Sequence, residues 1–404
     1  MDISKDIKHD FPIFKEWDIA YLDNAATSQK PYSVIEAESK FYALNNANVH
    51  RASYSLGLKA SQAFEDARAK IGKFVGVHDP DAVIFTKNAT EAINIVARGL
   101  IPTRLKQGST VLVSRMEHHA NFVPWQQLSK THKLNFQTIP VTDEGQICLD
   151  SYKKLLADNP AVVCLSHCSN VLGNITLIKE FVQLAKKVGA LTVVDGTQAV
   201  PHLTVDVPDI GADFYTFTGH KMLGPTGIGV LTGEKASLEL LSPSTFGGDM
   251  IDRVTLSDSS FAQLPSRLEA GTPPVAQAIG LAAACDYLTN IGLHNVRSHE
   301  QKLLSILHEG LDSIKEVQTY GAKQINSRSG ICAFNVTNAH AHDISMVLDQ
   351  MKVCVRSGDH CAQPLMTELG MQGSLRASIY IYNSENDIER MIKAVQKAVK
   401  LFVK

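Results

Sequence analysis

Apolar residues between positions 56 and 195 follow two periods in turn. Residues 56–76 repeat apolar side chains at helical spacing, so that Ala60, Phe64 and Ile71 share one side of a helix. Beyond them, short runs that are apolar throughout alternate with stretches of helical spacing. We expect strands at 82–86, 109–114, 161–166 and 190–195, and helices at 88–101, 119–130 and 177–189. This alternation predicts an α/β fold, a mostly parallel sheet covered by helices on both faces.

The alternation changes twice towards the C-terminus. Residues 214–218 and 227–232 are typical of strands, but they flank a turn with Lys221 and leave no room for a helix. After residue 294, strand-like and helical stretches predict a smaller α+β domain. We therefore expect a large domain at 22–293 and a small domain at 294–404, with residues 1–21 packed against the small one.

Composition narrows the class of protein. The 404 residues carry a formal net charge of -2 and no long basic run, which argues against a nucleic-acid or membrane partner. The charged N-terminal stretch is unlike a secretory signal, and the seven cysteines are odd in number. We expect a reduced, cytoplasmic protein.

One short segment, "VRSGDHCAQPL" (355–365), places a thiol among charges. Arg356, Asp359, His360 and Cys361 fall within six residues, and glycine and proline on either side predict a loop. This segment alone leaves four interpretations of Cys361 open: a metal ligand, a redox sensor, a nucleophile or a residue without a chemical role.

Three further places offer groups for a ligand. Thr90 lies where a strand leads into a helix, whose free N–H groups favour a phosphate, although Asn88 or Thr90 capping the helix is the simpler interpretation. Asp195 follows an apolar strand at the edge where open α/β sheets bind ligands, with Gln198 close behind; capping the next segment is its alternative. Lys221 lies in a turn between apolar strands. A surface charge is the usual role of a lysine, but a lysine in this setting is also where a lowered pKa and Schiff-base chemistry are expected.

Histidine and cysteine spacing does not predict a metal. His118 and His119 follow a strand, but "CLSHC" forms no zinc spacing with any other pair. Neither the dinucleotide-binding nor the P-loop glycine pattern is present.

Taken together, the three places describe one ligand. Pyridoxal 5'-phosphate needs a lysine for its aldehyde, a carboxylate for its ring nitrogen and an anion site for its phosphate. We expect it as the cofactor, with Lys221 as its Schiff-base partner.

Several motifs resemble one family along the whole chain. "EHHAN", "VDGTQAVPH", "TGHKMLGPTGIGVL", "RLEAGTP" and "GDHCAQPL" are similar to the group II, SUF-type cysteine desulfurases, of the class V aminotransferase group of fold-type I pyridoxal-phosphate enzymes. The resemblance implies that L-cysteine is converted to L-alanine and that Cys361 receives the sulfur as a persulfide. It also implies a homodimer, a SUF-type sulfur-acceptor protein and a part in iron–sulfur cluster assembly.

The resemblance assigns roles residue by residue. The implied catalytic residues are Lys221, Cys361 and His118. The implied cofactor-binding residues are Thr90, His118, Asp195, Gln198, Thr218, His220, Lys221 and Thr272. Thr272 is similar to a residue that reaches the phosphate of the neighbouring subunit, and Gln198 to one that faces the phenolic oxygen. The implied substrate-binding residues are Asn170, Arg356 and Arg376, with no metal ligand.

The surroundings of the thiol depart from the family at one position. Asp359 stands where the family often has histidine, and its charge should lower the thiolate fraction of Cys361. Arg356 and His360 should raise that fraction.

Two other functions remain open at this point. A selenocysteine lyase or cysteine-sulfinate desulfinase would share the fold, and so would a non-catalytic assembly scaffold. Selenocysteine would be a possible substrate of the first.

Overall fold

The larger part of the molecule is built on one sheet. The computed structural model describes residues 3–50 and 53–402. Seven strands lie in the order β2-β8-β7-β6-β5-β3-β4. The strands from β7 to β4 are parallel, whereas β8 is antiparallel to both of its neighbours. Their bounds are β2 Val83–Thr86, β3 Thr110–Ser114, β4 Asn135–Ile139, β5 Val162–Ser166, β6 Leu191–Asp195, β7 Phe214–Thr218 and β8 Gly229–Thr232.

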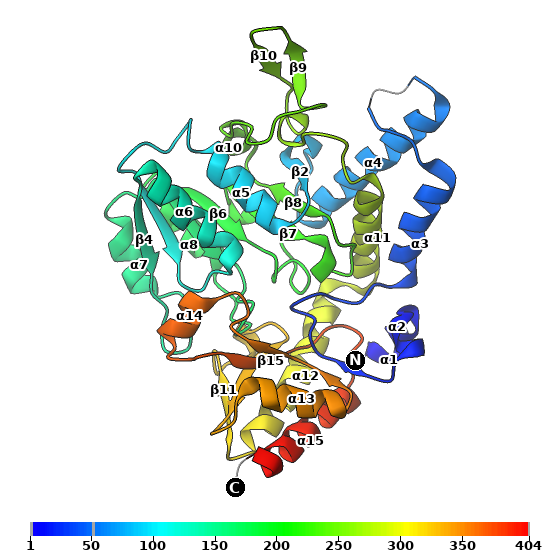
Figure 1. Ribbon diagram of the computed structural model, residues 1–404, viewed down its shortest axis with the longest axis vertical. Helices are drawn as coiled ribbons and strands as arrows, with labels where there is room; N and C mark the ends of the chain where they lie inside the picture. Colours follow the sequence, from blue (N-terminus) through cyan, green and yellow to red (C-terminus); the bar gives the residue numbers. More distant parts are fainter. Residues whose placement is uncertain (1–2, 51–52, 403–404) are drawn as a thin grey trace.

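Helices surround this sheet (Figure 1). They are α3 Tyr32–Lys40, α4 Ser55–Phe74, α5 Ala89–Gly99, α6 Val123–His132, α7 Leu149–Leu156, α8 Ile178–Lys187, α9 Val207–Ile210, α10 Lys235–Glu239 and α11 Val275–Ile291. Figure 1 shows α3, α4 and α11 together on one side, with α6, α7 and α8 on the other. The expected mostly parallel α/β sheet covered by helices is confirmed.

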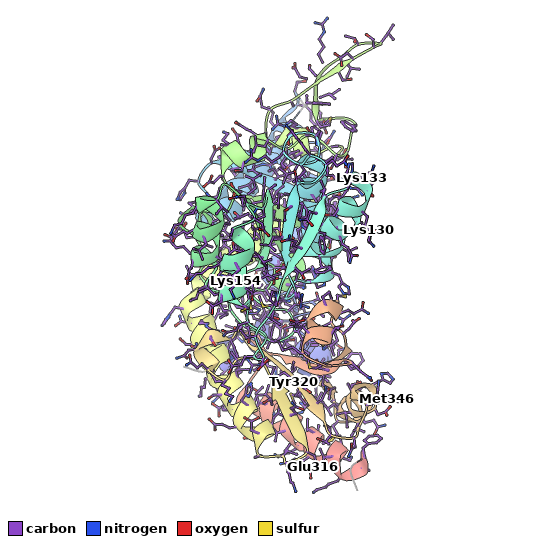
Figure 2. The ribbon with its side chains drawn as sticks, turned by 90° about the vertical axis from the view of Figure 1, so that its left-hand side faces the viewer. Lys130, Lys133, Lys154, Glu316, Tyr320 and Met346 are labelled. Carbon is purple, nitrogen blue, oxygen red and sulfur yellow. The ribbon has the colours of Figure 1, made fainter. Side chains whose placement is uncertain are left out.

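The residues after α11 form a second sheet of four antiparallel strands, in the order β11-β12-β15-β14. The strands are β11 Val317–Tyr320, β12 Ile331–Val336, β14 Arg356–Gly358 and β15 Ser374–Ser378. The helices are α12 Leu293–Asp312, α13 Ala341–Gln350, α14 Gln363–Glu368 and α15 Glu385–Phe402. This is an α+β arrangement below the large sheet, and Figure 2 shows it from the side, with Met346 on the lower body and Lys154 on the upper.

The N-terminal segment reaches both bodies. Strand β1 (Ala20–Tyr21) pairs in parallel with β13 (Val353–Cys354), and Leu22 belongs to the second hydrophobic core. Before it come two short helices, α1 (Ser4–Ile7) and α2 (Ile13–Glu16), and Phe11 packs in the first core. The boundaries 22–293 and 294–404 remain a prediction.

A hairpin of β9 (Ile251–Val254) and β10 (Ser259–Phe261) projects from the end opposite the small sheet (Figure 1). Within residues 3–50 and 53–402, none of the helices is long and apolar enough to cross a membrane.

Candidate active site

Lys221 lies in a tight turn between two antiparallel strands. The turn links β7 to β8, and at Gly219 a Cβ atom would lie only 2.9 Å from Cγ2 of Ile228. Burial, and after it the positive charge of Arg376, lowers the pKa of the Lys221 amine to about 8. Roughly one such amine in ten is unprotonated at pH 7, as a nucleophile or a base requires.

The peptide bond that precedes Lys221 is anchored by four donors. The carbonyl oxygen of His220 accepts from the main-chain N–H of Ser28 at 3.0 Å and from its hydroxyl at 3.2 Å. It also accepts from Oγ1 of Thr27 at 3.1 Å and from Nζ of Lys30 at 2.9 Å. The lysine backbone is therefore fixed by the segment that follows β1. Burial lowers the pKa of the His220 ring to about 4, so the ring is neutral.

The carboxylate of Asp195 stands at the end of β6, at the edge expected for a ligand site. Oδ1 accepts from the main-chain N–H of Thr197 at 2.9 Å, and the side chain is buried. Gln198 donates from Nε2 to the carbonyl of Ala25 at 2.8 Å, while its buried Oε1 has no partner.

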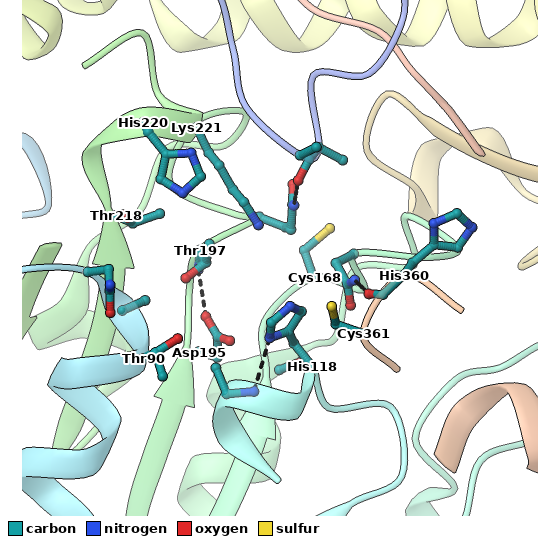
Figure 3. Close-up of a pocket in the computed structure, with 18 of the residues that line it drawn as sticks. Thr90, His118, Cys168, Asp195, Thr197, Thr218, His220, Lys221, His360 and Cys361 are labelled. Atoms are coloured by element: carbon teal, nitrogen blue, oxygen red, sulfur yellow. Dashed lines mark hydrogen bonds between the residues drawn. The ribbon is translucent and has the colours of Figure 1, made fainter. Parts of the chain in front are cut away.

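At the start of helix α5, helix capping and ligand binding fall to different residues. Asn88 caps the helix, since its side chain accepts from the main-chain N–H of Glu91 at 2.9 Å. Thr90 does not cap it; its side chain lines the cavity described below (Figure 3). The capping interpretation is thus correct for Asn88, and the hydroxyl of Thr90 is left for a ligand.

His118 is a neutral imidazole with an assignable proton. Nδ1 accepts from the main-chain N–H of Ala120 at 3.0 Å, which places the ring proton on Nε2. Burial, and after it the charge of Lys221, lowers the pKa of the ring to about 4. His118 therefore presents an N–H donor rather than a cation to its surroundings.

The buried guanidinium of Arg376 comes from strand β15 of the small sheet. It donates to the carbonyl of Asn170 at 2.9 Å and to Oδ1 of Asp23 at 3.2 Å, and its Nε has no partner. Arg356, half exposed, lies 3.9 Å from the same Asp23 carboxylate. A guanidinium with an unpaired buried N–H suits a substrate carboxylate.

The thiol of Cys361 is exposed on a turn between β14 and α14. The prediction of a loop over 355–365 is wrong at both ends. Residues 356–358 form β14 at the edge of the small sheet, and residues 363–365 begin helix α14. His360 and Cys361 both have left-handed backbones, with φ 52° and 56°.

The prediction that His360 raises the thiolate fraction of Cys361 is also wrong. Burial lowers the pKa of its ring to about 3, so it carries no positive charge at neutral pH. Its Nε2 lies 3.1 Å from the carbonyl of Ser374, and Figure 3 shows the ring turned away from Cys361. It therefore does not raise the thiolate fraction of that cysteine.

A single cavity of about 240 Å³ brings these groups together (Figure 3). Its lining includes eleven of the twelve residues expected from the sequence: Thr90, His118, Asn170, Asp195, Gln198, Thr218, His220, Lys221, Arg356, Cys361 and Arg376. The twelfth, Thr272, lies outside this lining and is exposed. The cavity lies where the carboxyl ends of the large sheet meet the small sheet.

Comparison with known proteins identifies the family of this chain. The model of the family described as "Aminotransferase class-V" matches residues 20–391. The chain belongs to the class V aminotransferase family. A probable cysteine desulfurase of Halalkalibacterium halodurans is 42% identical over 401 residues, covering 98% of both chains. A cysteine desulfurase of Haloferax volcanii is 42% identical, covering 95% of this chain and 90% of its own.

Two solved structures of cysteine desulfurases have the same fold. The apo cysteine desulfurase from Thermococcus onnurineus NA1 superposes with a TM-score of 0.95 at 38% identity, covering 99% of both chains. The cysteine desulfurase CsdA from Escherichia coli gives 0.92 at 33% identity, again covering 99% of both chains. The fold is that of the pyridoxal-phosphate enzymes of fold-type I. The resemblance found in the sequence is confirmed as far as a pyridoxal-phosphate-dependent, class V cysteine desulfurase; selenocysteine lyase, desulfinase and scaffold are not favoured.

The cavity of this class V chain fits pyridoxal phosphate. The amine of Lys221, the carboxylate of Asp195 and the first turn of the 11-residue helix α5 all border it. Oε1 of Gln198 and Nε of Arg376 are buried polar atoms without partners, the kind that a polar ligand satisfies.

Three cavity or neighbouring residues escaped the sequence analysis. Asp23, which pairs with Arg376, directly follows the apolar run 20–22, so a signal like that of Asp195 was present. Cys168 lines the cavity but is buried, and its neighbourhood suggested only a failed zinc spacing. Glu117 is fully buried beside Ser166, and nothing in the local sequence marks a carboxylate as buried.

Proposed function

We propose that this protein takes sulfur from L-cysteine as a persulfide on Cys361 and passes it to a SUF-type acceptor protein in iron–sulfur cluster assembly, in the cytoplasm and as a homodimer. One observation carries the proposal. Cys361 lies 140 residues beyond Lys221 (361 − 221), yet both side chains line one cavity. An exposed thiol is of use to an acceptor protein only if it can also reach the substrate.

Lys221, Asp195 and the residues around them hold the cofactor in this proposal. Thr90, Thr218 and His220 hold its phosphate, and Gln198 faces its phenolic oxygen. When bound, pyridoxal phosphate supplies an aldehyde for an amine and a ring that accepts an electron pair from the substrate. The carboxylate of Asp195, fixed at the strand end, would face the ring nitrogen, and its negative charge would favour the protonated form of that nitrogen.

The substrate is held by its carboxylate and loses a proton to the lysine. The fork of Arg376, oriented by Asp23, binds the carboxylate of L-cysteine, with Asn170 and Arg356 beside it. Lys221, once its amine is free, removes the proton from the α-carbon. The N–H of the His118 Nε2 is placed to donate to the reacting groups.

Sulfur leaves on the enzyme thiol. Sγ of Cys361 bonds to the sulfur of the substrate while the bond from that sulfur to carbon breaks. The electron pair of the broken bond stays on carbon, which is protonated and released as L-alanine. L-Cysteine and one enzyme thiol thus give L-alanine and one enzyme persulfide, with no external oxidant.

The test removes one thiol at a time. Cys361→Ala should abolish alanine release from L-cysteine while the cofactor spectrum still changes on adding the amino acid. Cys148→Ala is the matched control, since Cys148 is another free cysteine, its pKa is lowered by hydrogen bonding to Ser151, and it lies outside the cavity lining. Alanine release by Cys361→Ala at the wild-type rate would refute the proposal. Selenocysteine should remain a substrate of Cys361→Ala, because selenium leaves without a nucleophile.

A further inference from the structure

The loop that carries Cys361 is fastened to the large domain at the residue after His118. The main-chain N–H of His119 donates to the carbonyl of Cys361 at 2.7 Å. In return, the main-chain N–H of Gln363 donates to Nε2 of His119 at 3.1 Å. His119 therefore bonds to the backbone of this segment at two points, the carbonyl of Cys361 and the N–H of Gln363. A separate bond, from Nδ2 of Asn170 to the carbonyl of His360 at 2.7 Å, holds the preceding residue.

This turn needs outside support. Gly358, His360 and Cys361 all have positive φ, at 123°, 52° and 56°. Two successive residues with side chains in the left-handed region persist only where the surroundings fix them. Inside the turn, Asp359 offers only its Oδ1 to the N–H of Cys361, at 3.2 Å, and its carbonyl to the N–H of Ala362, at 3.0 Å.

The bond to the ring also satisfies the start of a helix. Gln363 is the first residue of α14, and a first-turn N–H has no partner within its own helix. The ring of His119 supplies the acceptor through its Nε2. Adjacent histidines thus serve two parts of the site: His118 borders the cavity, and His119 borders the loop.

We propose that His119 is a positioning residue that sets where the sulfur of Cys361 stands over the cavity. The inference rests on the proposed function, in which Cys361 accepts the sulfur. His119 touches neither the cofactor nor the substrate in this role; it acts through the backbone of residues 361 and 363.

Three variants separate the contribution of the His119 ring from that of its main-chain N–H. His119→Gln keeps an acceptor at the end of the side chain, and His119→Ala removes it. His119→Pro removes both the acceptor and the N–H. Proline fits there, since residue 118 is extended, with φ -60° and ψ 150°, and residue 119 begins the short helical turn 119–121.

Two measurements on the holoenzyme test how firmly the loop is held and how well it places Cys361. Hydrogen exchange at the Gln363 amide should be about two- to tenfold faster in His119→Ala than in wild type, the size of one lost hydrogen bond. His119→Gln should restore much of the protection. In single turnover, persulfide formation on Cys361 should slow in the order Gln, Ala, Pro, while the cofactor's spectral change on binding L-cysteine keeps its wild-type midpoint in all three.

The outcomes distinguish failure of the inference from failure of the function. If wild type forms the persulfide and His119→Pro forms it equally fast, the positioning role is wrong and the proposed function stands. If wild type forms no persulfide on Cys361, the proposed function is wrong. A shifted spectral midpoint in His119→Ala would place the residue in substrate binding and overturn the inference.

Discussion

Arg376 donates to Asp23 at 3.2 Å across 353 residues of sequence, and the pair joins the small sheet to the N-terminal segment. Both partners sit where water is largely excluded. Burial lowers the pKa of Arg376 and raises that of Asp23, although each charge opposes the shift of the other. The pair therefore fixes a geometry more than it adds stability.

Removal of the Asp23 carboxylate should lower the stability of the protein. Asp23→Asn leaves a buried guanidinium without its counter-charge, so we expect the free energy of unfolding to fall by about 1–3 kcal/mol. L-Alanine, whose carboxylate can replace the lost one, should then raise the melting temperature of the variant more than that of wild type. Differential scanning fluorimetry with and without L-alanine measures both. Asp18→Asn, which removes an exposed partner of Arg390, is the control and should show neither effect.

Glu117 should make stability depend on pH. Burial raises the pKa of its carboxyl to about 8, although Asn121 and Ser166 donate to Oε2 at 2.7 and 2.9 Å. The unfolded chain has an ordinary glutamate, so between the unfolded pKa and about 8 folding must bind a proton, and stability falls as pH rises through that window. The negative charge of Asp195 on β6 also raises the pKa of Glu117, and Glu117 in turn raises the pKa of the buried Cys164 thiol on β5.

Glu117→Gln imitates the protonated acid and removes this dependence. The variant should gain on the order of 2–3 kcal/mol over wild type between pH 5 and pH 7, measured by urea unfolding at each pH. Glu180→Gln, on the exposed side of α8, should give the same difference from wild type at both pH values. A constant difference for Glu117→Gln would mean that the carboxyl is ionised when buried.

The negative charge of Asp359 should restrain the thiol. Its Oδ1 accepts from the N–H of Cys361, so the carboxylate stands within the turn. Asp359→His should raise the rate of alkylation of Cys361 at neutral pH by about two- to fivefold, since a nearby negative charge disfavours the thiolate. Asp359→Asn keeps an oxygen for the N–H and isolates the effect of charge. An unchanged rate-versus-pH profile in both variants would count against this.

Thr272 should act across a dimer. It is exposed and outside the cavity of its own chain, as a residue that serves the neighbouring subunit must be. Lys221→Ala and Thr272→Ala homodimers should each be impaired. Mixed and refolded in equal amounts, they should recover about one quarter of wild-type sites, because each hybrid contains one site with both residues intact. No recovery, with hybrids shown by mass spectrometry, would place Thr272 on its own subunit.

The fold and much of the site could be predicted because they have local causes. Strands β2, β3, β5 and β6 are almost wholly buried, and most of their residues are therefore apolar. Asp195 is the last residue of β6, and Lys221 lies in a turn that has no room for a helix. Strand β4 escaped because it is an edge strand, only partly buried, and its sequence "NFQTI" mixes polar and apolar residues.

The rest has tertiary causes. No local pattern brings Cys361 over Lys221, and only the resemblance suggested it. The neutrality of His360 and the buried state of Glu117 depend on packing by other elements. Pairing of Asp23 with Arg376 depends on the N-terminal segment crossing to the small sheet.

The crossing of the N-terminal segment to the small sheet sets the order of folding steps in the nascent chain. Ala20 and Tyr21 pair with Val353 and Cys354, so β1 has no strand to pair with until residue 354 has been synthesised. The residues just after this strand are the ones that clamp the carbonyl of His220. The large sheet can form during translation, but we expect Lys221 to reach its final position only after the small sheet has been synthesised.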